Sequence, residues 1–231
     1  MNTTPAPQPQ HRPDQGVDIR DMIVVHTALL REFRLAPDAV RRATPGSRAL
    51  VRDVTAHLRL LCALMHHHHT GEDELLWPVL GPRLTDAERT LLEVAEAQHA
   101  GIDQSLHRVD QALTAWTAGP AEAEAAELVD ALGQLHVLLR EHLEAEERHL
   151  LPLAAAHLTE EEWHRIGEAG AAGVPKRDLL LVFGMFAYEG DPEVLAQMLQ
   201  AAPPPARVLV PRLAPRVYAR HAARIHGNRR P

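Results

Sequence analysis

Residues 61–78 read LCALMHHHHTGEDELLWP, and this stretch decides the fold of the chain. At about 100° per residue, one face of a helix over it carries both apolar and ionisable side chains. That face comprises Leu61, Met65, His68, Glu72 and Leu75. The remaining histidines of the run, His66, His67 and His69, point away from its centre. The stretch therefore predicts a helix that turns one histidine and one glutamate toward an apolar core.

Residues 135–152, LHVLLREHLEAEERHLLP, repeat this arrangement. His142 and Glu146 again stand four residues apart on a stripe of leucines, and a proline follows each of the two histidines by ten residues, Pro78 and Pro152. A register of this kind, kept between distant parts of one chain, indicates two related helical hairpins.

Two further histidines occupy the apolar stripes of the other helix in each hairpin. His26 precedes His68 by 42 residues, and His99 precedes His142 by 43 residues. Apolar residues flank both histidines at intervals of three and four, which is typical of the buried face of a helix. The sequence therefore places a histidine inside each of four helices.

The helices have recognisable ends. The first is predicted over residues 18–35 and is closed by Pro37 and a turn over residues 44–46; the second covers residues 47–77. A capping box, Thr85 with Glu88, opens the third, which continues to Trp116, and the fourth follows the Gly119-Pro120 break and ends near Pro152. Alanine, leucine and glutamate are abundant and aromatic residues make up only 3%. We predict an all-α chain built on an up-down-up-down four-helix bundle.

Three regions differ in composition. Residues 1–16 are polar and proline-rich without an apolar core, so we expect a disordered arm rather than a signal peptide. Residues 17–158 form the bundle. Residues 159–231 form a helical extension, with a second capping box at Thr159 and Glu162 and helices over the following ranges: 178–188, 192–201 and 211–225. The single cysteine, Cys62, and the lack of a long apolar run favour a soluble, cytoplasmic protein.

Glu72 and Glu146 need a partner in such an interior. Burying an ionised carboxylate costs several kcal/mol unless a cation or strong donors compensate it. Each glutamate has a histidine one turn earlier on the same face, so an imidazole and a carboxylate can reach one metal ion or two adjacent ions.

The pattern His, His-x-x-x-Glu, His, His-x-x-x-Glu over about residues 17–158 resembles the hemerythrin HHE cation-binding family. The resemblance implies a non-haem centre of two iron ions with an oxo or hydroxo bridge. Its ligands would be His26, His68, Glu72, His99, His142 and Glu146. If both glutamates bridge, each six-coordinate iron keeps one position free for a small molecule. Zinc or manganese at the same ligands remains an alternative.

One position departs from the oxygen-carrying hemerythrins, in which a fifth histidine closes one iron. Four residues after His99, where that histidine can stand, this chain has Asp103. We expect Asp103 to be a solvated helix residue; a further ligand or a partner that orients His99 is the alternative.

Three functions follow from this resemblance and from its departures. The first is binding or sensing of a small oxidant, O2, NO or peroxide, at the four-His two-Glu site. The second is a di-iron enzyme of oxidative-stress defence, either removing peroxide as a catalase does or repairing iron-sulfur clusters. The third is a helical interaction module without redox chemistry, in which the histidines only pack.

The other ionisable residues are predicted to lie outside the centre. Seven histidines are expected at the surface or the rim, namely His57, His66, His67, His69, His107, His136 and His149. Some proteins of the family place a tyrosine oxygen at the iron, but packing or exposure is the favoured role for Tyr188 and Tyr218. Seven arginines and no acidic residue follow Glu193, in a chain of formal net charge −7. This basic tail is expected to dock on the acidic bundle, with a partner protein or an anionic membrane surface as alternatives and nucleic acid excluded.

Overall fold

The computed structural model describes residues 16–44 and 47–231, and within them it contains helices and no strand. The predicted arm over residues 1–16 lies, except for Gly16, outside the described residues, as does most of the predicted turn at 44–46. In the described part, no helix is both long and apolar enough to cross a membrane. The prediction of an all-α protein is confirmed.

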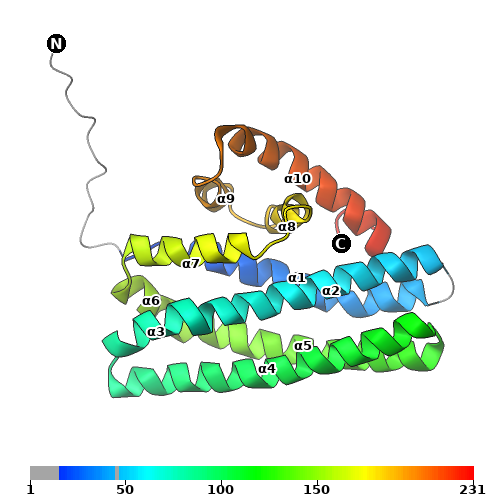
Figure 1. The fold of residues 1–231 in the computed structure, drawn as a ribbon, viewed down its shortest axis with the longest axis horizontal. Coiled ribbons are helices and arrows are strands. Elements are labelled where there is room, and N and C mark those ends of the chain that lie inside the picture. Colours follow the sequence, from blue (N-terminus) through cyan, green and yellow to red (C-terminus); the bar gives the residue numbers. More distant parts are fainter. Residues whose placement is uncertain (1–15, 45–46) are drawn as a thin grey trace, which may run out of the picture.

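Four long helices form the bundle (Figure 1). They are α1 (Arg20–Ala43), α2 (Arg48–Gly71), α4 (Asp86–Ala118) and α5 (Glu122–His149). They form a ring in which α1 packs on α2, α2 on α4, α4 on α5 and α5 on α1. Short segments connect and extend them, namely η1 (Glu72–Leu76), α3 (Trp77–Leu80), η2 (Gly81–Arg83) and α6 (Leu151–His157). The ring is closed because each helix presents one apolar stripe inward.

The sequence predicts the helix starts well. The Ser47 hydroxyl accepts a hydrogen bond from the Leu50 N–H and so caps α2. Thr85 and Glu88 form the predicted capping box at the start of α4, with the Thr85 hydroxyl accepting from the Glu88 N–H. These side chains satisfy amide groups that have no partner within the helix.

The predicted end of the first helix is wrong, because α1 continues through Pro37 to Ala43. A proline inside a helix removes one backbone hydrogen bond. Here the apolar stripe continues beyond it, and Ala36, Val40 and Ala43 are all fully buried against the bundle. Tertiary packing therefore outweighs the local preference of proline to end the helix.

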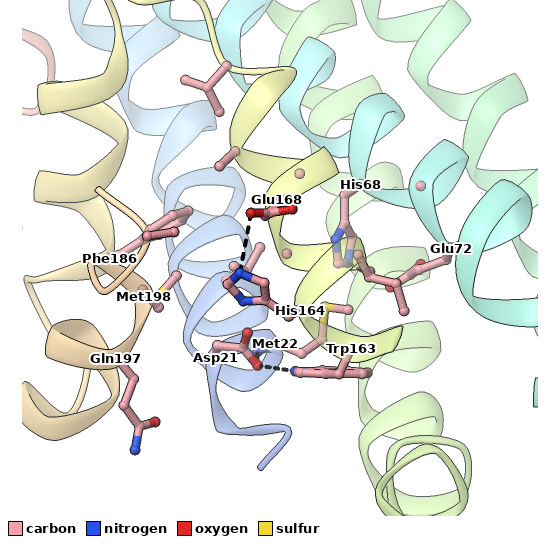
Figure 2. Close-up of a pocket in the computed structure, with 18 of the residues that line it drawn as sticks. Asp21, Met22, His68, Glu72, Trp163, His164, Glu168, Phe186, Gln197 and Met198 are labelled. Atoms are coloured by element: carbon pink, nitrogen blue, oxygen red, sulfur yellow. Dashed lines mark hydrogen bonds and ion pairs between the residues drawn. The ribbon is translucent and has the colours of Figure 1, made fainter. Parts of the chain in front are cut away.

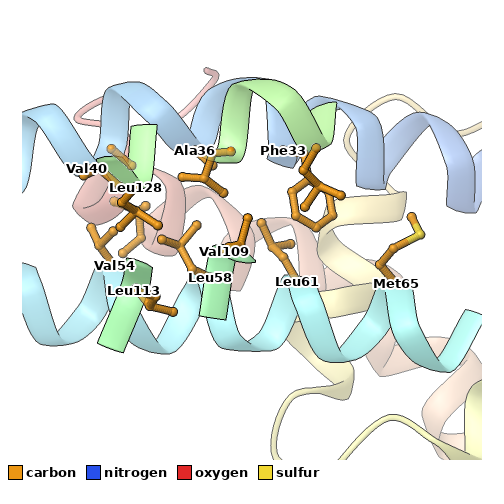
Figure 3. Close-up of a cluster of buried hydrophobic side chains, with 14 of the residues drawn as sticks. Phe33, Ala36, Val40, Val54, Leu58, Leu61, Met65, Val109, Leu113 and Leu128 are labelled. Carbon is orange, nitrogen blue, oxygen red and sulfur yellow. The ribbon is translucent and has the colours of Figure 1, made fainter. Parts of the chain in front are cut away.

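The core fills the interior along the bundle axis (Figure 3). It contains fully buried side chains from all four helices, among them Phe33, Val54, Leu58, Leu61, Met65, Val109, Leu113 and Leu128. This apolar packing occupies the half of the bundle toward the α1–α2 turn. A second apolar cluster, which includes Leu76, Leu80 and Leu151, lies at the other end, so the ionisable residues lie between two apolar clusters.

The extension comprises four helices that lie across one side of the bundle (Figure 1). They are α7 (Glu160–Ala172), α8 (Leu179–Phe186), α9 (Pro192–Met198) and α10 (Pro204–Ile225). The capping box of Thr159 and Glu162 opens α7 as predicted. The last helix begins seven residues earlier than predicted and contains Pro211 and Pro215.

The basic tail makes limited charge contact with the bundle. α10 packs on α8, and the buried side of α10 is formed by Ala214, Tyr218, Ala222 and Ile225. Its arginines are exposed, and Arg224 with Asp53 of α2 is the ion pair between them and the bundle in the described residues. Charge attraction between these arginines and the described part of the bundle is therefore limited to this ion pair.

Candidate metal centre

The six predicted residues meet inside the bundle, and all their side chains are at least nine-tenths buried. Together with His69 they form two groups that share Glu72. One group is His26, His68, Glu72 and Glu146, and the other is His69, Glu72, His99 and His142. Within each group, one donor atom from every residue lies within 4.8 Å of the others.

The imidazoles meet in pairs through their Nε2 atoms. His26 Nε2 lies 3.0 Å from His68 Nε2, and His99 Nε2 lies 3.0 Å from His142 Nε2. Each pair joins two neighbouring helices of the ring, α1 with α2 and α4 with α5. The two hairpins of the sequence repeat therefore each contribute one pair of imidazoles.

The two carboxylates lie between these pairs. Glu72 Oε1 is 3.2 Å from His68 Nε2, and Glu72 Oε2 is 3.5 Å from His99 Nε2. Glu146 Oε2 is 3.7 Å from both His26 Nε2 and His142 Nε2. Each glutamate thus faces one imidazole of either pair, which is the placement that bridging carboxylates require.

The carboxylate oxygens of Glu72 and Glu146 make no hydrogen bond within the described structure. All four oxygens are buried. Burial, and then the neighbouring Glu146, raise the pKa of Glu72 well above its ordinary value, and burial also raises the pKa of Glu146. Four carboxylate oxygens without hydrogen-bond partners, beside converging imidazole nitrogens, form a donor set that suits transition-metal cations.

The outward nitrogens of the same histidines are held by polar side chains. His26 Nδ1 lies 2.9 Å from Glu147 Oε1, His99 Nδ1 lies 2.8 Å from Asp73 Oδ1, and His142 Nδ1 lies 3.1 Å from Gln98 Oε1. Such contacts fix the ring orientation and the tautomer, so that Nε2 is free to bind. The partner that orients His99 is Asp73, not Asp103.

His69 corrects the prediction that only one histidine of the four-residue run faces the core. Its side chain is buried, stacks on His99 with ring centroids 4.1 Å apart, and leaves both ring nitrogens without a hydrogen bond. Burial lowers the pKa of His69 well below its ordinary value and keeps the ring neutral. The side of α2 that faces the core is thus wide enough to include two adjacent residues, about 100° apart.

A π-helical turn follows the run and changes the register. In η1 the Trp77 N–H donates to the Glu72 carbonyl, five residues earlier instead of four. As a result Leu76 is fully buried and Leu75, the residue predicted on the core face, is 39% exposed. Wide turns of this kind often lie at functional sites, and here the turn starts at a carboxylate of the centre.

The model of the hemerythrin HHE cation-binding domain family matches residues 17–154 of the chain. The chain belongs to this family. No curated protein and no solved structure matches it significantly. The hemerythrin-like domain is thus a cation-binding bundle, and its buried His and Glu groups form the part of it that could hold the metal.

Residues proposed as alternatives in the hemerythrin-like centre lie elsewhere. Asp103 is half-exposed and lies 3.4 Å from His66. The Tyr188 hydroxyl donates to the Pro231 carbonyl, and the Tyr218 hydroxyl donates to Glu32. Neither tyrosine hydroxyl hydrogen-bonds to any of the six residues predicted to bind iron. His57, predicted at the surface, is buried beneath the extension.

A cavity of about 520 Å³ lies between the bundle and the extension, with His68 and Glu72 on its wall (Figure 2). Its lining is mostly apolar and comes from α1, α2 and the extension, including Met22, Val25, Leu29, Leu64, Phe186 and Met198. Trp163 closes one part and donates from its indole N–H to Asp21. The extension therefore covers the hemerythrin-like centre while leaving room beside one of its two groups.

Proposed function

We propose that the chain holds two iron ions between five histidines and two glutamates and reversibly binds a small oxidant, O2 or NO. The observation that carries this proposal is the unequal division of the donors. Three imidazoles face one metal position and two face the other, and the cavity reaches the position with two.

Counting coordination positions gives this division a chemical meaning. With one oxygen from each carboxylate and one shared solvent-derived ligand, a metal near His69, His99 and His142 would be six-coordinate. A metal near His26 and His68 would keep one position free. The six ligands predicted from the sequence leave one coordination position open at each metal. His69 would fill one of them, as the fifth histidine does in oxygen-carrying hemerythrins; this chain has Asp103 where that histidine can stand.

The donor set supports binding over oxidation of large substrates. Ferritin-like oxidising centres use four carboxylates and two histidines, whereas this set has more imidazoles than carboxylates. Iron would supply the electrons that hold O2 and the vacant position that holds NO. The chain's own residues would hold and orient that iron.

The outer carboxylates contribute orientation and charge. Asp73 and Glu147 each accept from the outward nitrogen of a histidine, so the proton of those rings is held at Nδ1 and the lone pair of Nε2 points inward. The two carboxylates also add negative charge close to the centre, which compensates a cationic cluster.

The test uses the full-length protein reconstituted with ferrous iron without oxygen. About two iron ions per chain and an absorption band that appears with O2 and disappears when O2 is removed would support the proposal. Irreversible oxidation, or turnover of peroxide that follows iron content, would replace binding by the enzymatic function. A chain that takes up no iron would leave only the packing role of the histidines.

A further inference from the structure

We propose a second, separate metal site in which Glu32, His57 and His226 bind one divalent transition-metal ion, zinc being the ion that fits best. Glu32 comes from α1, His57 from α2, and His226 from the residue that follows α10. One donor atom of each lies within 4.8 Å of the others. The ion would fasten the end of the extension to the bundle.

The two distances from the imidazoles to Glu32 match those between ligands of a tetrahedral ion. His57 Nε2 and His226 Nε2 lie 3.3 Å and 3.4 Å from the same oxygen, Glu32 Oε2. Zinc bonds to nitrogen and oxygen are about 2.0–2.1 Å long, so neighbouring ligands of a tetrahedral ion stand roughly 3.3–3.4 Å apart. Three protein ligands leave a fourth position for water, as in many zinc sites.

Other groups hold the rest of Glu32 and leave Oε2 for the ion. Glu32 Oε1 accepts from the Tyr218 hydroxyl at 2.6 Å and from the Arg31 guanidinium at 3.0 and 3.1 Å. The carboxylate is fully buried, so its orientation is fixed by these contacts. Oε2 consequently points toward the two imidazoles.

His57 is set up as a ligand. Its Nε2 is buried and has no hydrogen-bond partner, so it is not aimed at Oε2 as a donor. Its Nδ1 lies 3.1 Å from His221 Nε2; when Nδ1 carries the proton and donates to His221, the Nε2 lone pair is left for a metal ion. An ion between His57 and Glu32 would use the lone pair that the fold leaves unpaired.

Glu32 is the carboxylate of the cluster, and Arg31 pairs with it and, at 2.8 Å, with the half-exposed Glu189. A hydrogen bond is the competing arrangement, in which a neutral His226 with its proton on Nε2 donates to Glu32 Oε2 at 3.4 Å. That arrangement leaves His57 Nε2 without a partner, whereas one metal ion would use all three donors.

The end of α10 is positioned independently of any ion, which makes variants of His226 suitable for the test. The Arg42 guanidinium of α1 donates to the carbonyls of Arg224 and Ile225. Tyr218 and Ile225 are buried in the interface. His226→Gln should therefore keep the extension folded and remove only the proposed ligand.

The experiment is a zinc titration of metal-free, full-length protein by calorimetry, with bound zinc counted afterwards. The wild type should bind three zinc ions and His226→Gln two. His164→Gln, a change of an exposed histidine in α7, should bind three. Glu146→Gln should lose zinc from the bundle and keep the ion at His226, so failure of the two sites is distinguishable.

Hydrogen exchange supplies a second readout. Zinc should slow exchange of residues 219–226 in the wild type and in Glu146→Gln, and not in His226→Gln. Equal zinc stoichiometry in wild type and His226→Gln, or the same exchange rates with and without zinc, would overturn the metal site and leave the hydrogen bond from His226 in its place.

Discussion

His69 is the residue that most changes the chemistry expected of this chain. It adds a third imidazole to the group around His99 and His142, and so makes the two proposed metal positions unequal. Its sequence neighbours give no sign of this, because all four histidines of the run are identical and their burial depends on how α2 sits against α4 and α5. The six other residues were predictable because each belongs to a repeated, periodic pattern.

We expect His69→Ala to weaken the second metal position selectively. The variant should bind about one tightly held iron per chain, because the group around His26 and His68 keeps all its donors. His66→Ala is the matched control, since His66 is exposed on the same helix turn. Iron content and affinity of both variants, measured side by side, test the assignment; identical values would remove His69 from the centre.

Core residues should carry the stability of the bundle independently of metal. Leu58 is fully buried among residues of the core. Leu58→Ala should lower the free energy of unfolding of the metal-free protein by about 2–5 kcal/mol, as large-to-small core changes do. Denaturant unfolding of metal-free wild type and variant measures this, and a loss below about 1 kcal/mol would show that the site can collapse around the change.

At the scale of elements, the helix starts marked by capping residues were predictable from the sequence, and the start of α10 and the departures from regular α-helix were not. Capping residues act locally, so Thr85 and Thr159 could be identified from two positions each. The passage of α1 through Pro37 and the wide turn at Glu72 depend on partners in other helices. Local preference could not predict either, because packing determines both.

The crossing of α8 and α10 depends on a glycine. A Cβ at Gly184 would clash with the Ala214 carbonyl and lie 2.8 Å from Tyr218 Cβ. Gly184→Ala should therefore destabilise the extension and speed hydrogen exchange of α10. Gly133→Ala in α5 is the control, because nothing lies within 4 Å of its Cβ, and it should stabilise by up to about 1 kcal/mol. Destabilisation by both changes alike would contradict the close crossing.

The attachment of α7 should depend on pH through Glu162. Its carboxylate accepts from the Arg83 guanidinium at 2.6 and 2.8 Å, and Arg83 lowers the pKa of Glu162 to about 2. A lowered carboxyl pKa means that this stabilisation is complete above the unfolded-state pKa, near 4.5, and disappears as pH falls to about 2.

Glu162→Gln isolates this charge, because glutamine still completes the capping box with Thr159. The variant should unfold at a lower temperature than wild type at neutral pH, and the difference should shrink as pH falls below about 4.5. Thermal unfolding of both proteins across that range is the measurement. A difference that stays constant with pH would assign the effect to packing.

At the scale of the whole molecule, the bundle was predictable and the arrangement of the extension was not. The four-helix ring follows from four amphipathic stripes that must face one another. The extension carries few long stripes, and its position depends on small residues of α10 and on buried contacts with Glu32 that no periodic pattern reveals. Its excess of arginine indicated charged contacts with the bundle, of which the described residues show one ion pair, between Arg224 and Asp53.

The proposed function requires two cations held between Glu72 and Glu146, and anomalous X-ray diffraction from crystals of the iron-loaded protein at the iron absorption edge tests this requirement. We predict two peaks within the bundle, one among His26, His68, Glu72 and Glu146 and the other among His69, Glu72, His99 and His142. A map without iron peaks there, or with Glu72 and Glu146 bonded to protein groups instead, would contradict the account.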